Sequence, residues 1–116
     1  MSNVYPGVVQ KGQKRAASLG FPTVNIPFFE RRISGIYIAK VVYDNEQYKA
    51  AAFVDEKRHI LEAHILDANP DLYGKEIMIE LIEKIRDNQQ FGDDDALKFA
   101  IAGDIGRVRK YFEKKV

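Results

Sequence analysis

The sequence of 116 residues contains no cysteine and no tryptophan, and only four prolines and two histidines. Without cysteine the chain has no disulfide framework, no thiolate metal site and no cysteine nucleophile. No apolar run approaches the roughly 18 residues that a membrane span requires, and the N-terminus shows no signal-peptide core. We therefore expect a soluble, cytoplasmic protein without a membrane partner.

Neither sign of charge dominates, because 18 basic residues face 17 acidic ones. A general nucleic-acid binder needs a clear excess of positive charge, so the balance argues against that class. Two histidines without further ligands at suitable spacing argue against a zinc site. The sequence also has no G-x-x-x-x-G-K-[ST] loop and no nucleophile elbow. A function must therefore come from other local groups of residues.

The length fits one domain, residues 1–116, and the sequence shows no repeat, low-complexity tract or linker. Its first two thirds contain short runs of β-branched and aromatic residues bounded by turn residues, which predict strands. The segment 75–86 fits a helix or a strand on periodicity alone, and the alternation of Ile77, Ile79 and Leu81 favours a strand. The predicted extended segments are 4–10, 21–26, 36–43, 47–54, 59–67 and 75–86, and residues 11–18 are expected as a loop.

Only the C-terminal part is clearly typical of a helix, because apolar residues recur there at three- and four-residue spacing. Asp93, Asp94 and Asp95 predict a start near Asp94, since carboxylates cap free amides and suit the helix dipole. Gly103 and Gly106 each cost about 1 kcal/mol in a helix interior, so we expect them to mark a close contact or an irregularity. The predicted apolar stripe is Ala96, Leu97, Ala100, Ile101, Ile105, Val108 and Phe112.

This order of elements predicts a mostly β fold with one helix at its C-terminal end. Many short strands joined by turns favour a closed or nearly closed antiparallel barrel, because closure removes exposed sheet edges. The helix is expected to cover an open end or a side of that barrel.

The most informative segment is Leu-Gly-Phe-Pro-Thr-Val-Asn-Ile at residues 19–26. On an extended strand, residues two apart share a face, so Thr23 and Asn25 point the same way. A hydroxyl and an amide carbonyl side by side are suitable neutral ligands for Mg²⁺, which also binds water and nucleotide phosphates. Upstream, the loop with Lys11, Gly12, Lys14 and Arg15 has the charge and the free amides to fold over phosphates. The alternative is an ordinary strand end beside a solvated loop.

A second segment, Leu-Glu-Ala-His-Ile-Leu-Asp at residues 61–67, places Glu62 and His64 on one face of a predicted strand. A glutamate between apolar strand positions is a candidate general base, since partial burial raises its pKa toward the working range. Taken alone, the segment also fits a surface glutamate beside a surface histidine.

Together these segments resemble the conserved blocks of the riboflavin kinase family. The Leu-Gly-Phe-Pro-Thr-Val-Asn run resembles the family's Pro-Thr-Ala-Asn signature, with Val24 in place of the alanine. The resemblance covers nearly the whole chain, from Gly7 to about Tyr111, and the blocks occur in the family's order. The matching segments are 19–25, 62–67, 71–75, 85–86 with Phe91, 96–98 and 101–105.

The resemblance implies a six-stranded antiparallel Greek-key barrel with a C-terminal α-helix. It implies transfer of the ATP γ-phosphate to the riboflavin 5′-hydroxyl, giving FMN and ADP, with Mg²⁺ or another divalent cation. We expect the protein to be a monomer. Thr23 and Asn25 would hold the metal, and Glu62 would be the catalytic base. The implied nucleotide-binding residues are Gly12, Lys14, Arg15, Gly20, Pro22, Thr23 and Asn25, and the implied flavin-binding residues are Arg86, Phe91 and Asp104.

Two departures from the family pattern leave a second hypothesis open. Ala16 and Ala17 stand where the family usually has a Gly-Arg or Ser-Lys pair, so a phosphate-loop cation would come from Lys14 or Arg15. The stretch 50–58 is shorter than in the family and lacks its Asn-Ile-Gly and Pro-Thr elements. The alternative is therefore a non-catalytic flavin- or nucleotide-binding barrel derived from the family, although the presence of all three candidate active-site residues favours the kinase.

Overall fold

The computed structural model describes residues 3–12 and 15–114, and every strand predicted from the sequence is present in it. The strands are β1 (Asn3–Val8), β2 (Val24–Pro27), β3 (Gly35–Tyr43), β4 (Glu46–Asp55), β5 (Ile60–Ile65) and β6 (Glu76–Arg86). The helices are α1 (Arg15–Ser18) and α2 (Asp94–Glu113). The prediction of a loop for residues 11–18 is wrong where α1 lies, because a helix of a single turn carries no apolar periodicity that could reveal it.

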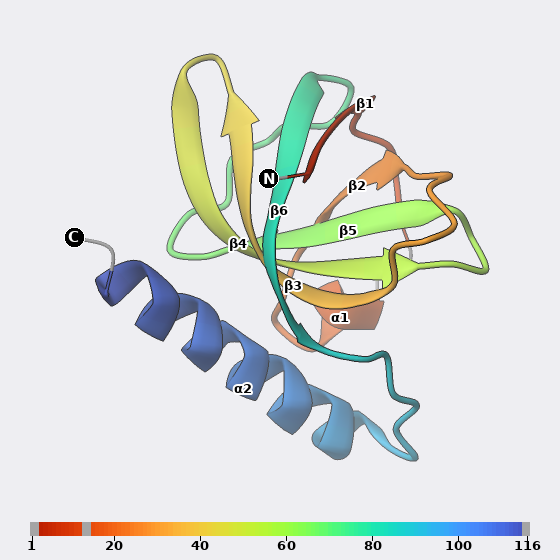
Figure 1. Cartoon of the computed structure of the whole chain (residues 1–116). Coiled ribbons are helices and arrows are strands. Elements are labelled where there is room, and N and C mark those ends of the chain that lie inside the picture. Colours follow the sequence, from red (N-terminus) through yellow and green to blue (C-terminus); the bar gives the residue numbers. More distant parts are fainter. Residues whose placement is uncertain (1–2, 13–14, 115–116) are drawn as a thin grey trace.

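The six strands of the described chain form one antiparallel sheet in the order β1-β6-β3-β4-β5-β2. The sheet curls until its two edge strands, β1 and β2, approach each other (Figure 1). Beyond the end of β1, the Gln10 amide donates a hydrogen bond to the Asn25 carbonyl at 2.8 Å. The result is a nearly closed barrel with the non-sequential strand order of a Greek key, which confirms the predicted fold class.

Strand β4 is buried on both of its faces, which explains its run of alanines. Ala50 and Ala52 belong to the core inside the barrel, and Ala51 belongs to a second apolar cluster beneath α2. All three alanines are fully buried. Figure 1 shows α2 crossing the outside of the barrel, where it contacts β3 and β4. Because the side chain at residue 51 is a single methyl group, the helix can lie close to the sheet.

Helix α2 begins where the aspartates predict. Asp93 is its N-cap, and the Asp93 carboxylate accepts a hydrogen bond from the Ala96 amide at 2.8 Å. Ala96 itself is exposed and does not join the buried stripe. The close contact or irregularity expected at Gly103 and Gly106 is absent, because the helix continues through both residues and each faces open space. Neither helix of the described residues has the length and apolar character of a membrane span.

Gly7 lies at the edge where the barrel closes, and its lack of a side chain is required there. A Cβ at Gly7 would come within 2.7 Å of the Ile26 Cβ. We expect Gly7→Ala to lower the free energy of unfolding by about 1–3 kcal/mol, because overpacking forces the backbone to shift. Urea denaturation measures this change.

Gly106→Ala is the matched control, since the Cβ it would add meets no atom within 4 Å apart from its chain neighbours and the backbone of its own helix. This substitution should raise the free energy of unfolding by about 1 kcal/mol, because alanine is the better helix former. Equal effects of the two substitutions would contradict a tight closure between β1 and β2.

Candidate active site

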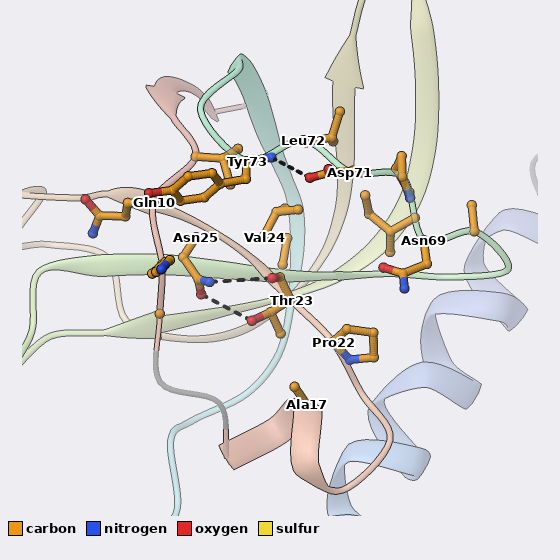
Figure 2. Close-up of a pocket in the computed structure, with 17 residues that line it drawn as sticks. Gln10, Ala17, Pro22, Thr23, Val24, Asn25, Asn69, Asp71, Leu72 and Tyr73 are labelled. Carbon is orange, nitrogen blue, oxygen red and sulfur yellow. Dashed lines mark hydrogen bonds between the residues drawn. The ribbon is translucent and has the colours of Figure 1, made fainter.

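A cavity of about 440 Å³ lies beside β2. Its walls come from the ends of β1 and β2, from α1, from β5 and from the loop before β6, and Figure 2 shows Thr23 and Asn25 between Ala17 and Tyr73. We call it the first cavity. The lining residues used below are Gln10, Lys11, Gly12, Ala17, Pro22, Thr23, Asn25 and the segment 68–73.

Thr23 and Asn25 lie together in the wall of this cavity, as their two-residue spacing predicts. The Thr23 Oγ1 atom is 3.2 Å from the Asn25 Oδ1 atom and 3.3 Å from the Glu62 Oε1 atom. A hydroxyl has one hydrogen to donate, so these two oxygens compete for it. The Asn25 Nδ2 atom is directed to the Thr23 carbonyl at 3.5 Å (Figure 2). The three side chains thus form one small polar group on the barrel wall.

Strand pairing and close packing place this group. In the register of β2 with β5, Asn25 is the partner of Glu62, which brings the two side chains into one region. Gly12 packs directly on the Asn25 side chain, because a Cβ at Gly12 would lie 2.5 Å from the Asn25 Cγ atom. Any larger residue at position 12 would therefore displace the amide. Gly12 contributes to the site by making room for Asn25.

Glu62 is half-buried on β5 and reaches the Thr23 hydroxyl. Burial raises the pKa of the Glu62 carboxyl, and the nearby negative charge of Asp55 raises it further. The hydrogen bond from Thr23 and the charge of Arg58 act in the opposite direction but are weaker. The raised pKa makes Glu62 a better proton acceptor than an exposed glutamate, as expected from the apolar positions around it.

A second cavity of about 200 Å³ lies on the other side of α1. Ala17 of this helix lines the first cavity, whereas Arg15 and Ala16 line the second. Glu62 also lines the second cavity, so the Thr23–Glu62 hydrogen bond connects the two. The remaining walls of the second cavity are mainly aromatic, aliphatic and amide side chains: Ile36, Phe53, Arg86, Asn88, Gln89, Phe91, Leu97 and Ile101.

Arg86 and Phe91 line the second cavity, but Asp104 does not. The Arg86 Nε and Nη2 atoms each donate a hydrogen bond of 2.9 Å to the carboxylate of Asp104, a residue that is only 3% exposed. The Arg86 guanidinium also lies 5.7 Å from the centre of the Phe91 ring. Asn88 connects the loop after β6 to the barrel, because its Nδ2 atom donates a hydrogen bond to the Val54 carbonyl at 3.1 Å. Asp104 therefore contacts Arg86 and holds it in the cavity wall.

The other residues singled out in the sequence are dispersed. Pro22 lines the first cavity, and Gly20 lines neither, since it occupies an exposed left-handed turn with φ +96°. Arg15 pairs with Asp94 at 3.3 Å beside the second cavity. Lys14 lies outside the described residues. The role of these residues in nucleotide binding stays a prediction.

The predicted nucleotide-binding residues did not include Lys11, although the sequence places it in the basic loop before Thr23. Lys11 is the one cation among the described residues that line the first cavity. Its Nζ atom lies 6.0 Å from the centre of the Tyr73 ring, which lines the same cavity. Which lysine faces the cavity depends on the path of the loop, which local sequence does not specify.

The fold and the cavities define a small, nearly closed antiparallel barrel with two adjoining cavities that meet at the Thr23–Glu62 pair. The model of the riboflavin kinase family, flavokinase, matches residues 3–112. The chain therefore belongs to the riboflavin kinase family.

Relatives share this similarity over most of the chain. The bifunctional riboflavin kinase/FMN adenylyltransferase of Mycoplasma pneumoniae is 34% identical over 111 residues, covering 91% of this chain and 41% of that protein. The protein of the same description from Escherichia coli K12 is 35% identical over 116 residues, which cover 91% of this chain and 37% of that protein. The chain thus spans about two-fifths of the length of these curated relatives. The crystal structure of riboflavin kinase from Trypanosoma brucei has the same fold, with a TM-score of 0.71 at 23% identity. The match covers 97% of this chain and 78% of that one.

The raised pKa of Glu62 predicts a pH-dependent stability difference. The folded protein binds the Glu62 proton more tightly than the unfolded chain, where the pKa is about 4.3. The ionised carboxylate therefore lowers the stability of the parent as pH rises above that value. We expect the free energy of unfolding of Glu62→Gln, relative to the parent, to increase between about pH 4 and about pH 7. Chemical denaturation across this range measures it.

Asp67→Asn provides a control, because its stability relative to the parent should depend on pH in the opposite direction. The hydrogen bonds from Arg109 lower the pKa of the Asp67 carboxyl, so its contribution to stability is present above its unfolded pKa and is lost as pH falls. The amount by which Asp67→Asn lowers the free energy of unfolding, relative to the parent, should therefore shrink below about pH 4. A pH-independent difference between Glu62→Gln and the parent would show that Glu62 ionises normally.

Proposed function

We propose that this chain is a riboflavin kinase, which transfers the γ-phosphate of ATP to the 5′-hydroxyl of riboflavin to give FMN and ADP. The observation that carries the proposal is the Thr23–Glu62 hydrogen bond, which connects the first cavity to the second. Phosphoryl transfer depends mainly on holding donor and acceptor in line and on neutralising charge, and two cavities that meet at a carboxylate suit that task. Membership of the riboflavin kinase family supports the same reaction.

The first cavity is the proposed site for ATP and a divalent cation. Thr23 and Asn25 present two neutral oxygens 3.2 Å apart, an oxygen donor set that fits Mg²⁺ when phosphates and water supply the remaining ligands. When bound, the cation would offset the negative charge of the phosphates. Lys11 adds a positive charge to the same cavity, and Gly12 and Pro22 complete the wall beside the oxygens.

The second cavity is the proposed site for riboflavin. The flat rings of Phe53 and Phe91 and the aliphatic side chains near them suit the isoalloxazine ring system. Asn88 and Gln89 bring amide groups to the same wall, and amides can pair with the polar edge of that ring. Arg86 is fixed beside them through Asp104. Apolar walls with a few placed polar groups are typical of small-molecule sites.

Glu62 is the proposed general base at the junction of the cavities. Its carboxylate accepts the proton of the 5′-hydroxyl while that oxygen forms a bond to the γ-phosphorus. The bond from the γ-phosphorus to the β–γ bridging oxygen breaks, and ADP leaves with the electron pair. Burial favours this role because it raises the pKa of the Glu62 carboxyl.

A second candidate function is binding without phosphoryl transfer. It is favoured by α1, which presents only Ala17 to the first cavity and therefore brings no charge to it. Incubation of the parent protein with riboflavin, ATP and Mg²⁺, followed by chromatography for FMN, distinguishes the two functions. We further propose a cytoplasmic monomer without a nucleic-acid partner, which sedimentation and cell fractionation can test.

Glu62→Gln tests the catalytic assignment, because it preserves the size of the side chain and removes the basic oxygen. We expect turnover to fall by at least about a hundredfold, since a positioned base contributes roughly 10²- to 10⁴-fold. Riboflavin and ATP affinities should stay close to those of the parent, because the lost interaction is made mainly in the transition state. Steady-state FMN formation and calorimetric titrations measure both quantities. Turnover within a few-fold of the parent would remove Glu62 from the mechanism.

Asn25→Leu tests the metal site, because it keeps the volume of the side chain and removes the amide oxygen. We expect ATP affinity in the presence of Mg²⁺ to fall at least about tenfold, toward the affinity measured without the metal. Calorimetric titration of ATP with and without Mg²⁺ measures this difference. Lys11→Gln is a useful contrast, since loss of a cation should weaken ATP binding both with and without Mg²⁺. Unchanged Mg²⁺-dependent affinity in Asn25→Leu would show that Asn25 does not bind the metal.

A further inference from the structure

The His64 side chain makes a hydrogen bond to the backbone just before β2, where the strand pairing of β2 with β5 has stopped. The pairing of β2 with β5 extends from Pro27 and Ile60 to Val24 and Ala63, and no further pair follows on the side of Thr23. Pro22 has no backbone N–H group, so it cannot donate to a continuing ladder. The His64 Nδ1 atom instead lies 2.7 Å from the Pro22 carbonyl oxygen. Because a carbonyl can only accept, the Nδ1 atom carries the hydrogen and donates it.

A second set of contacts fixes the same short segment. The His64 ring meets the Phe21 ring edge to face, with centroids 5.6 Å apart and planes at 89°. The Phe21 amide donates a hydrogen bond of 2.9 Å to the Ala16 carbonyl in α1. The backbone just before Thr23 is therefore held between α1 on one side and His64 of β5 on the other.

The position of the Thr23 hydroxyl depends on this segment. Thr23 directly follows Pro22, and its contacts of 3.2 Å and 3.3 Å with Asn25 and Glu62 are longer than the usual range of hydroxyl hydrogen bonds, which ends at about 3.0 Å. A small displacement of the Pro22 carbonyl would break one or both of them. His64 itself lines neither of the two cavities.

We propose that His64 is a positioning residue: its imidazole holds the Pro22 carbonyl and so fixes the Thr23 hydroxyl between Asn25 and Glu62. The proposal rests on the proposed kinase function for its effect on catalysis. The effect should fall on the Mg²⁺–ATP side of the reaction, because Thr23 lines the first cavity and the flavin side chains line the second.

Two substitutions separate the hydrogen bond from the ring contact. His64→Asn places an amide nitrogen near the position of the Nδ1 atom and keeps the donor, whereas His64→Phe keeps a ring against Phe21 and removes the donor. We expect His64→Phe to lower kcat/KM for Mg²⁺–ATP at least about tenfold, the usual scale for loss of a supporting hydrogen bond near a metal site. His64→Asn should stay within about threefold of the parent, and riboflavin affinity should change little in either variant.

The Thr23 methyl resonance in a ¹³C-labelled sample reports the position of this side chain without reference to activity. It should shift in His64→Phe and stay close to the parent in His64→Asn. An unshifted signal in His64→Phe, or equal losses of kcat/KM in the two variants, would overturn the positioning role. If the parent makes no FMN, the proposed function fails, and the methyl signal still decides whether His64 positions Thr23.

Discussion

The register of β2 against β5 is the constraint on which the site depends. It makes Asn25 the partner of Glu62 and directs both side chains away from the barrel core. A slip by one residue would reverse every side chain of the pair, turning Glu62 inward and its neighbours outward. Leu61 and Ala63, which flank Glu62, are fully buried, so that slip would expose them. Burial of apolar residues inside the barrel therefore selects the register that assembles the polar group.

Closure of the barrel then decides what surrounds this group. The Gln10 amide bonds to the Asn25 carbonyl, and the chain leaves β1 so close to Asn25 that only glycine fits at position 12. The same path leads into α1, which lies between the two cavities with Ala17 on one side and Arg15 and Ala16 on the other. A single turn of helix thus separates the two sites while Thr23 and Glu62 remain in contact beside it.

Helix α2 supports the second cavity from outside the barrel. It packs over Ala51, and its Asp104 carboxylate receives two hydrogen bonds from Arg86 at the end of β6. A buried, bidentate ion pair adds little net stability, because desolvation offsets much of the attraction. The two parallel hydrogen bonds require a specific geometry, however, and they fix the Arg86 guanidinium beside Phe91. The helix therefore orients the loop after β6 as well as covering the sheet.

The sequence by itself determined the six strands, helix α2 and the local pairs, but not the single turn of α1. Alternating apolar residues gave the strands, three- and four-residue spacing with capping aspartates gave α2, and the extended backbone brought Thr23 and Asn25 together. These features depend on neighbours along the chain. The tertiary structure alone decided that Asp104 contacts Arg86, that Lys11 faces the first cavity, and that Gly103 meets open space. Each of these depends on how distant segments pack, and no local periodicity or propensity specifies which distant surfaces meet.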